Sequence, residues 1–497
     1  MSAQQKKWGV ILRYIQMISN VVIKFVYTPF LLRALGQNEY GLFSLTMSIV
    51  GYLAILDLGF GSTVTRFTVK YRSEGDEQKL RKMYSTLSVI YILIGLLAML
   101  ICFLLSISAD NLFGRTMTDV EVGKLKIMIL LCGVNLLFTF PLQIAGSVLV
   151  AYEKFIVKNG VTLLFTFVQP IVMVVLLYLV NMKSVGAIVV VTSCNLLTYL
   201  IYYLYPVKRL DFKFSFRLFE PKMIKGLLSF SVWMFLVMLF EQLQYNSGQF
   251  IIGLFQGADI VAIWGIAMIF ILNYRSISTA ITNVFVPSFM SLSFENNNEG
   301  IENTVYRMTH VQALALVLIL TNFILFGKAF IHLWAGGEYD DAFPCALIVM
   351  LSMTPALILE FCYLYQLSSN QLLYKVATSF ASFIATFVVI YFARGINLYS
   401  YAWVMAISLL IGQVLFVYWF VRKHMRVRIT ELAKRIIKVC WLPVVLTLFY
   451  YFVLTTRFPI DGYKALIIHA IVFNIVLLIS MWFVSLTDTD RKMVLRR

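Results

Sequence analysis

Charged residues are scarce in this sequence. Only 13% of its 497 residues are Asp, Glu, Lys or Arg, whereas 61% are hydrophobic, and the mean hydropathy is +0.85. A water-soluble domain carries about a quarter charged residues, so this scarcity excludes a soluble globular protein. The apolar residues come in blocks of about 20, the length that crosses the hydrocarbon core of a bilayer. The sequence therefore predicts an all-α integral membrane protein.

Cysteine and histidine are also few. The six cysteines lie in apolar segments without a CxxC pair, and the four histidines show no ligand spacing. Disulfides, a metal centre and a cofactor are therefore not expected. The first apolar stretch follows Lys6 and Lys7 as a signal peptide would, but Arg13, Asn20 and Lys24 interrupt it, and no small-residue cleavage site follows. We interpret it as a retained first helix.

The apolar blocks predict about 14 transmembrane helices. Their approximate ranges are 10–34, 40–64, 84–107, 126–151, 159–180, 184–206, 224–253, 259–291, 308–334, 342–368, 372–393, 398–421, 437–456 and 464–486. An even number places both termini on one side, and the connections on that side hold most of the lysines and arginines. Because basic loops stay in the cytoplasm, both termini are predicted to be cytoplasmic. The net charge of +17 is then a topology signal, and nucleic acid is not an expected partner.

A weak internal repeat divides the chain. Residues 36–38 align with residues 257–259, each after a long helix, and the same shift pairs Asn20 with Glu241. Repeated halves are a transporter architecture in which the substrate binds between them. We expect two six-helix bundles related by pseudo-two-fold symmetry and a C-terminal extension, at 1–206, 207–421 and 422–497. In the extension, the basic segment 425–438 is predicted to lie on the inner membrane surface or to form a solvated connector.

Polar residues at membrane depth give the strongest functional signal. In the first predicted helix they recur three or four positions apart, on one face of an α-helix: Arg13, Gln16, Asn20, Lys24 and Thr28. A lysine near mid-membrane costs a few kcal/mol unless it faces water or a partner. This stripe is therefore predicted to line an aqueous cavity. Snorkelling of Arg13 to the headgroups and a structural ion pair at Lys24 are the alternatives.

Acids, bases and amides also occur at depth in later helices. Glu241 and Gln249 lie in the seventh predicted helix, Arg275 in the eighth and Glu360 in the tenth. Intramembrane charges in different helices indicate either structural ion pairs or a cavity that binds an anion together with a coupling cation.

Asp57 lies in the run LDLGFG of the second predicted helix, and Arg66 follows it toward the cytoplasmic headgroups. Arg13 is expected at a similar depth, so Asp57 has two candidate cationic partners. We predict a structural pair or a cytoplasmic gate at Asp57 and Arg66. An ion-coupling role for Asp57 is the alternative.

The stretch from Leu35 to Asp76 resembles the signature of bacterial polysaccharide exporters, the O-antigen (Wzx-type) flippases of the multidrug/oligosaccharidyl-lipid/polysaccharide (MOP) superfamily. The matching elements are Leu35-Gly36, Tyr40-Gly41, Leu56-Asp57-Leu58-Gly59 and Arg66-Phe67. A second match is IIGLFQGADIVAIWGIA at 251–267. The resemblance implies a flippase of the bacterial inner membrane. It would move an undecaprenyl-pyrophosphate-linked oligosaccharide, an O-antigen or capsule-type repeat unit, to the periplasmic face by alternating access.

Such a substrate has a multiply charged pyrophosphate and a hydroxyl-rich glycan. Three cationic side chains would hold the phosphates by charge-assisted hydrogen bonds: Lys24, Arg13 and Arg275. Three amide side chains would form hydrogen bonds with sugar hydroxyls: Gln16, Asn20 and Gln249. Carboxylates at depth would carry a coupling H⁺ or Na⁺: Glu241, Glu360 or Asp57. The expected partners are the lipid-linked oligosaccharide, membrane lipids and other polysaccharide assembly proteins.

Three alternatives remain. A cation-coupled multidrug exporter of the same superfamily would have an acidic cavity, which the bases at depth disfavour, whereas a lipid II flippase is not distinguished by charge. A membrane polysaccharide polymerase or ligase would carry catalytic residues on a large outward loop. The longest outward connection, about 108–125, is short and shows no catalytic pairing. The sequence therefore favours transport over catalysis.

Overall fold

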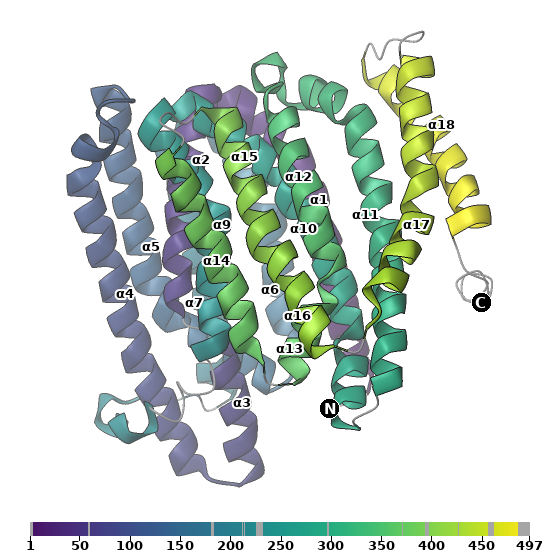
Figure 1. Ribbon diagram of the computed structural model, residues 1–497. Coiled ribbons are helices and arrows are strands. Elements are labelled where there is room, and N and C mark those ends of the chain that lie inside the picture. Colours follow the sequence, from purple (N-terminus) through teal and green to yellow (C-terminus); the bar gives the residue numbers. More distant parts are fainter. Residues whose placement is uncertain are drawn as a thin grey trace. The chain divides into compact units, whose positions relative to one another are not determined.

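The computed structural model describes residues 3–57, 60–179, 183–210, 212, 214–224, 232–295, 298–369, 371–392, 397–425, 427–455 and 462–485. Every regular element within these ranges is a helix (Figure 1). The bilayer interior offers no water to backbone N–H and C=O groups, so a helix, which pairs these groups internally, is the element expected there. The predicted all-α membrane fold is confirmed.

Eleven helical stretches among the described residues are long and apolar enough to cross a membrane, and Leu372–Val388 is a shorter apolar helix. The eleven do not include the charged helix at residues 3–35, which has 33 residues, or the helix at 232–256, which has 25. The predicted count of 14 is therefore not confirmed, although the multi-pass architecture is.

The chain forms two compact units, residues 1–262 and 263–497. The helices of the first unit are α1 (Ala3–Leu35), α2 (Gln37–Leu53), the 3₁₀ turn η1 (Ala54–Asp57), α3 (Phe60–Ser73), α4 (Glu77–Phe113), α5 (Asp119–Ala151), α6 (Phe155–Leu179), α7 (Ser184–Arg209), η2 (Phe216–Leu218) and α9 (Val232–Gln256). The first residues of α10 (Ala258–Phe294) also belong to it.

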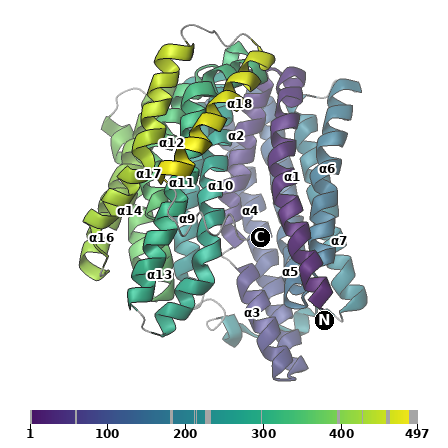
Figure 2. The same ribbon diagram turned by 90° about the vertical axis from the view of Figure 1, so that its right-hand side faces the viewer.

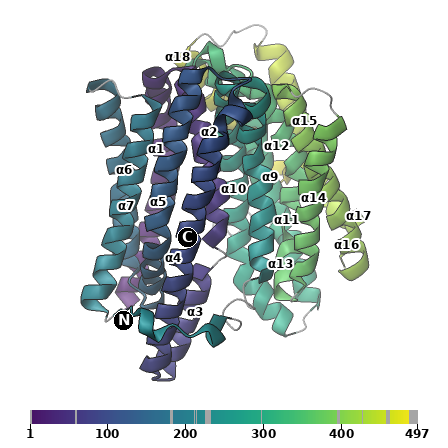
Figure 3. The same cartoon turned by 90° about the vertical axis from the view of Figure 1, so that its left-hand side faces the viewer.

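Within the first unit, α5 packs between α4 and α7, and α1 lies along α6 (Figures 2 and 3). Small residues allow the backbones to approach closely, as in other membrane helix pairs. A Cβ atom at Gly95 of α4 would lie 2.9 Å from the Leu137 carbonyl oxygen of α5. One end of this unit holds the start of α1, the turn between α3 and α4, the turn between α5 and α6, and the end of α7. We call it the basic end.

Side-chain caps fix where the long helices of the first unit begin. Asp76 accepts a hydrogen bond from the Lys79 backbone N–H (2.9 Å) before α4. Thr118 and Glu121 form a reciprocal capping box before α5. Hydrogen bonds from the Lys79 ammonium and backbone N–H lower the pKa of the Asp76 carboxyl. The cap therefore contributes its full stability when the pH is above the ordinary pKa of an aspartate. This contribution is lost as the pH falls through the lowered pKa of Asp76.

The helices of the second unit follow α10. They are α11 (Asn298–Ala335), η3 (Gly337–Tyr339), α12 (Ala342–Ile358), α13 (Phe361–Ser368), α14 (Leu372–Phe392), α15 (Leu398–Leu409), the π-helical η4 (Leu410–Leu415), α16 (Phe416–His424), α17 (Ile429–Phe449), the π-helical η5 (Tyr450–Thr455), α18 (Tyr463–Ser480) and the π-helical η6 (Met481–Ser485). Asn322 of α11 and Asn474 of α18 exchange amide hydrogen bonds of 3.0 and 2.8 Å. This pair fixes the last helix against α11 inside an otherwise apolar contact.

Several predicted helices are interrupted. The helix expected at 40–64 is broken by η1, the one expected at 342–368 turns at residues 359–360, and the one expected at 398–421 contains η4. The amphipathic residues 429–438 are not a separate surface helix, because α17 runs without a break from Ile429 to Phe449. Their apolar side is covered in part: Leu432 is buried, Ile436 packs on the same core, and the Arg435 guanidinium carbon lies 4.4 Å from the Tyr306 ring centroid, whereas Ile437 is 64% exposed.

Candidate functional site

A cavity of about 630 Å³ lies inside the first unit between α1, α5, α6 and α7. From α1 it is lined by Gln16, Asn20 and Lys24, three members of the stripe that the spacing predicted. The Thr28 hydroxyl, the next member, donates to the Lys24 carbonyl oxygen (2.7 Å) and is buried. Arg13 lies in α1, but its side chain is outside the described residues.

The other three helices supply polar groups that the sequence analysis did not select. The lining includes one amide from each of them and a second cation: Gln143 of α5, Gln169 and Lys158 of α6, and Asn195 of α7. Gln143, Gln169 and Asn195 each occur once in an apolar run, without the repeated spacing that marks α1, so their only signal was a single polar residue at membrane depth. Lys158 lies in a basic connection between two predicted helices, where its charge indicates topology and not a cavity.

Tyrosines of α7 order the wall near Lys158. The Tyr202 hydroxyl donates to the Lys158 carbonyl oxygen (3.1 Å) and shares a hydrogen bond with the Thr162 hydroxyl. Tyr199 also lines the cavity and packs edge-on against Tyr202, with 5.9 Å between ring centroids. Aromatic rings with hydroxyl edges present both an apolar face and hydrogen-bonding groups, the combination that sugar rings require.

The charge of the described cavity wall is positive. Lys24 and Lys158 line it, and none of the lining residues in the described part of the chain is an Asp or a Glu. Amide and hydroxyl side chains contribute neutral donors and acceptors on all four helices. The site is therefore suited to an anionic group attached to a hydroxyl-rich one.

Asp57 lies outside this lining, at the end of η1. Its carboxylate accepts a hydrogen bond of 2.5 Å from the Tyr91 hydroxyl of α4. Tyr91 is fully buried between the Phe60 and Phe140 rings, at 5.8 and 6.4 Å between centroids. Arg66 lies in the second turn of α3, on an exposed side of that helix. The gate and ion-coupling roles of these residues stay predictions.

The remaining candidates lie elsewhere. Glu241 and Gln249 are on α9 in the first unit, and Gln249 is buried with no hydrogen bond to its Oε1 atom among the described residues. Arg275 on α10 and Glu360, at the turn between α12 and α13, belong to the second unit. None of these four lines the α1–α5–α6–α7 cavity in the described part of the chain.

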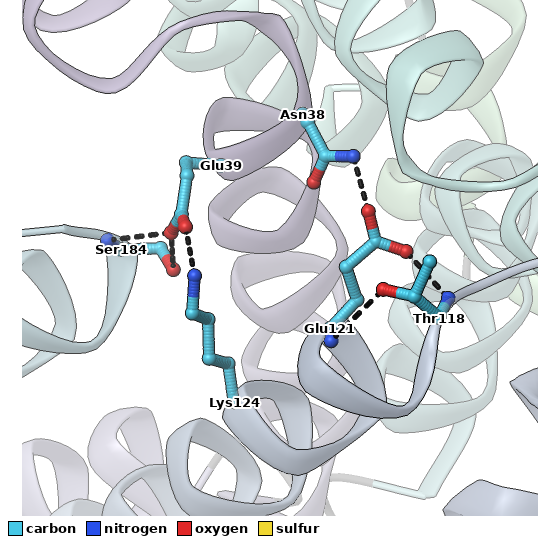
Figure 4. A network of polar contacts seen from close by, with 6 residues as sticks. All are labelled: Asn38, Glu39, Thr118, Glu121, Lys124 and Ser184. Atoms are coloured by element: carbon cyan, nitrogen blue, oxygen red, sulfur yellow. Dashed lines mark hydrogen bonds and ion pairs between the residues drawn. The ribbon is translucent and has the colours of Figure 1, made fainter.

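Two polar networks lie where α2, α5 and α7 begin, at the end of the first unit opposite the basic end, and Figure 4 shows them from close by. Glu39, in the first turn of α2, forms an ion pair with Lys124 of α5 and accepts hydrogen bonds from the Ser184 hydroxyl and backbone N–H of α7. Beside it, Asn38 donates to Glu121. These contacts tie α2, α5 and α7 together beyond the cavity.

No group of three or more His, Cys, Asp or Glu residues that could hold a metal ion occurs among the described residues. The six cysteines are unpaired; five are buried and Cys440 is half-buried.

The chain has relatives of low identity in two bacteria. An uncharacterized membrane protein of Bacillus subtilis (strain 168), EpsK, is 22% identical over 340 residues, which are 66% of this chain and 65% of that protein. The chain thus spans just under two thirds of this relative. A Shigella flexneri protein named as an O-antigen transporter is 23% identical over 314 residues, 63% of this chain and 72% of its own length.

Solved structures of similar shape come from the MOP superfamily. The lipid II flippase MurJ, in an inward closed conformation, aligns with a TM-score of 0.70 at 15% identity and covers 96% of this chain and 98% of its own. An inward-facing MATE multidrug transporter aligns with a TM-score of 0.63 at 12% identity, and the alignment covers 86% of this chain and 99% of the transporter. At these identities the likeness shows the fold. Residues 6–293, more than half of the sequence, match the polysaccharide biosynthesis protein family, and the chain belongs to that family.

Proposed function

We propose that this protein is a flippase that moves an undecaprenyl-pyrophosphate-linked oligosaccharide across the bacterial inner membrane. The observation that carries the proposal is the cationic, hydroxyl- and amide-lined cavity between α1, α5, α6 and α7. Lys24 and Lys158 would bind the pyrophosphate by charge-assisted hydrogen bonds. Gln16, Asn20 and Tyr199 would meet the first sugars. Transport, not catalysis, is the proposed activity, and no cofactor is required for it.

Coupling to an ion is the finer part of the proposal. Asp57, Glu241 and Glu360 are the carboxylates proposed to exchange H⁺ or Na⁺ during an alternating-access cycle. Asp57 has the clearest structural basis, because its donors among the described residues, Tyr91 and Gln143, are neutral groups and not cations. A carboxylate without a fixed counter-ion can gain and lose a proton or a cation at lower cost than one held in a salt bridge.

The remaining parts of the proposal concern substrate and place. Gln249, Arg275 and Arg13 stay proposed substrate contacts, and other polysaccharide assembly proteins stay proposed partners. Both termini, and hence the basic end, are proposed to face the cytoplasm, because the connections there concentrate the basic residues. The name of the Shigella flexneri relative supports an O-antigen type of cargo.

A lipid II flippase is the second candidate, because lipid II also carries a pyrophosphate and the fold is that of MurJ. A multidrug exporter is disfavoured by the cavity wall, since a cationic drug would meet two lysines and no lining carboxylate among the described residues.

The test is complementation of a strain that lacks this gene. The wild-type chain should restore surface glycan, and Lys24→Ala and Lys158→Ala should each reduce it about tenfold, the effect of losing one hydrogen bond to a charged group. Lys24→Arg keeps the charge and should restore most of the export. Lys183→Ala, an exposed lysine outside the cavity, is the control and should export normally.

Reconstituted vesicles separate the candidate substrates. Purified protein should flip a fluorescent lipid-linked repeat unit and leave fluorescent lipid II in place, whereas the reverse result would assign the second candidate. If the deletion strain keeps its surface glycan, or if both alanine variants export at the wild-type rate at equal expression, the proposed function or the proposed site is wrong.

A further inference from the structure

A second, smaller pocket lies at the basic end of the first unit, apart from the cavity described above. Its volume is about 240 Å³, and the turn between α3 and α4 and the ends of α5 and α7 enclose it. The side chains that define it are Tyr71, Arg72, Arg81, Tyr84, Tyr152 and Leu210. It shares no lining residue with the α1–α5–α6–α7 cavity.

Arg72 is the central cation of this pocket. Its guanidinium carbon lies 3.8 Å from the centroid of the Tyr152 ring. Stacking holds a guanidinium by its face, so its N–H edges remain available in a planar fork that matches two oxygens of a phosphate group. Arg72 is thus positioned as an anion ligand.

The ion pairs around the same turn involve other residues. Lys79 pairs with Asp76 at 2.8 Å, Lys70 with Glu74 at 3.9 Å, and Arg81 with Glu77 at 3.8 Å. No carboxylate pairs with Arg72 in the described part of the chain. The lining therefore holds two guanidinium groups and one carboxylate, Glu77, and carries a net positive charge.

Tyr84 supplies a neutral donor from the floor of the pocket. It is 2% exposed, and its ring packs on Phe212, with 4.9 Å between centroids. Its hydroxyl lies beside Thr68 and Tyr152, yet makes no hydrogen bond within 3.5 Å to the described residues. A bound acceptor oxygen within reach of this hydroxyl would receive its hydrogen bond.

The backbone that carries Tyr152 is held rigidly. After α5 ends, the Lys154 N–H donates to the Leu149 carbonyl (2.8 Å) and the Glu153 N–H to the Val150 carbonyl (2.9 Å). This is the Schellman pattern of a helix C-terminus. The Tyr152 ring, the platform on which Arg72 stacks, therefore projects from a backbone that hydrogen bonds hold at the end of α5.

We propose that this pocket binds a phosphate group, either the headgroup of an anionic lipid or a free phosphate. The Arg72 guanidinium is a donor-only group, the Tyr84 hydroxyl can donate beside it, and the Arg81 guanidinium, which Glu77 shares, keeps the lining net positive, a combination that favours an acceptor-rich anion. The volume accommodates a phosphate with a short glycerol or similar substituent, but not an oligosaccharide. Lipid headgroups lie at the depth expected for this end of the helices, and anionic headgroups concentrate at the cytoplasmic face.

The experiment measures binding to the purified full-length chain in a non-ionic detergent, by calorimetry or by the shift in unfolding temperature. The probes are inorganic phosphate, dihexanoyl-phosphatidylglycerol, and dihexanoylglycerol, which has the same acyl chains without the phosphate. Saturable binding of phosphatidylglycerol alone assigns a lipid site, and binding of inorganic phosphate as well assigns a site for the free anion. Either result supports the proposal.

Variants then locate the site. Arg72→Ala should weaken the apparent Kd about tenfold, as expected for a lost hydrogen bond to a charged group. Arg72→Lys keeps the charge but loses the planar fork, and Tyr152→Leu removes the platform, so both should bind more weakly than the wild type. Lys208→Ala, an exposed lysine at the same end outside the pocket, should change affinity less than twofold.

The proposal is overturned by any of three results. One is the absence of saturable binding of both phosphate probes to the wild-type chain. Another is dihexanoylglycerol binding as tightly as phosphatidylglycerol. The last is unchanged affinity in folded Arg72→Lys and Tyr152→Leu variants, which keeps the test decisive even if Arg72→Ala does not fold.

Discussion

Glu153, directly after α5, has a backbone φ of +56°, the one positive φ among the described non-glycine residues. It occupies the C′ position of the Schellman turn, where glycine is usual because a Cβ atom clashes in the left-handed conformation. The side chain is half-buried. The end of α5 therefore stores strain beside Tyr152, the platform of the Arg72 pocket.

We predict that Glu153→Gly unfolds at a higher temperature than Glu153→Ala. Both variants remove the same carboxylate, but only glycine relieves the left-handed strain, which costs about 1 kcal/mol or more in an L-residue. Thermal or urea unfolding in detergent measures the difference. Equal stability of the two variants would show that residue 153 is not strained in solution.

At the residue scale, the candidate site was partly predictable. Gln16, Asn20 and Lys24 were found because they repeat at helical spacing in one segment, so a local pattern encodes a shared face. Lys158 and Asn195 come from different helices, and no local pattern shows that α6 and α7 bring them to the same cavity. Tyr91 was missed as the donor to Asp57 for the same reason, because it lies 34 positions along the chain.

At the element scale, α2 owes its close packing to glycine. A Cβ atom at Gly41 would lie 1.8 Å from the Ala258 carbonyl oxygen at the start of α10, and one at Gly51 would lie 2.9 Å from the Asn246 amide nitrogen of α9. Gln242 of α9 also donates to the Gly51 carbonyl (3.1 Å). These contacts hold α2 against α9 and the first residues of α10 within the first unit.

We predict that Gly41→Ala destabilises the protein by about 3 kcal/mol, the upper range for overpacking, because the opposing atom belongs to the backbone and cannot turn away. Gly123→Ala, in α5 with no atom within 4 Å of the added Cβ, is the matched control. Alanine is the better helix former, so this control should gain about 0.5–1 kcal/mol. Unfolding of the purified variants decides, and a Gly41→Ala variant as stable as the control would contradict the packing.

Where a helix is continuous, length and hydropathy predicted its apolar part, but α1, α4, α5, α11 and α17 begin seven to ten residues before the predicted starts, because polar turns extend these helices beyond the apolar block. The breaks were not predicted. Residues 359–360 interrupt an apolar run that reads as one helix, and the break depends on α11. Oriented with its amide nitrogen toward α12, Gln312 donates to the Leu357 and Ile358 carbonyls (3.0 and 3.3 Å) and accepts from Ser278 and Thr282. Only the tertiary structure supplies such a partner to the carbonyls beside the break.

The internal repeat also has a structural counterpart. Gly36 before α2 and Gly257 before α10, aligned by the sequence, both have positive φ values, +78° and +87°. An L-residue with a side chain disfavours this conformation, so the two turns require glycine for the same reason. The two predicted six-helix bundles stay a proposal, and this shared turn supports it.

At the scale of the whole molecule, the charges of the connections predict its orientation. The basic end of the first unit carries a run of lysines and arginines around the α3–α4 turn, and such loops remain in the cytoplasm. Both proposals depend on this orientation: the cargo would enter the cavity from the side of its synthesis, and the Arg72 pocket would face the anionic inner leaflet.

We therefore predict opposite labelling of two single cysteines. Five native cysteines are buried and should react slowly, and the half-buried Cys440 is replaced by alanine as background. Val120→Cys, an exposed position at the end opposite the basic end, should react with a membrane-impermeant maleimide in intact spheroplasts. Ser73→Cys, exposed at the basic end, should react only after permeabilisation. Labelling of Ser73→Cys in intact spheroplasts would reverse the orientation, and then neither the direction of export nor a cytoplasmic phosphate site could be sustained.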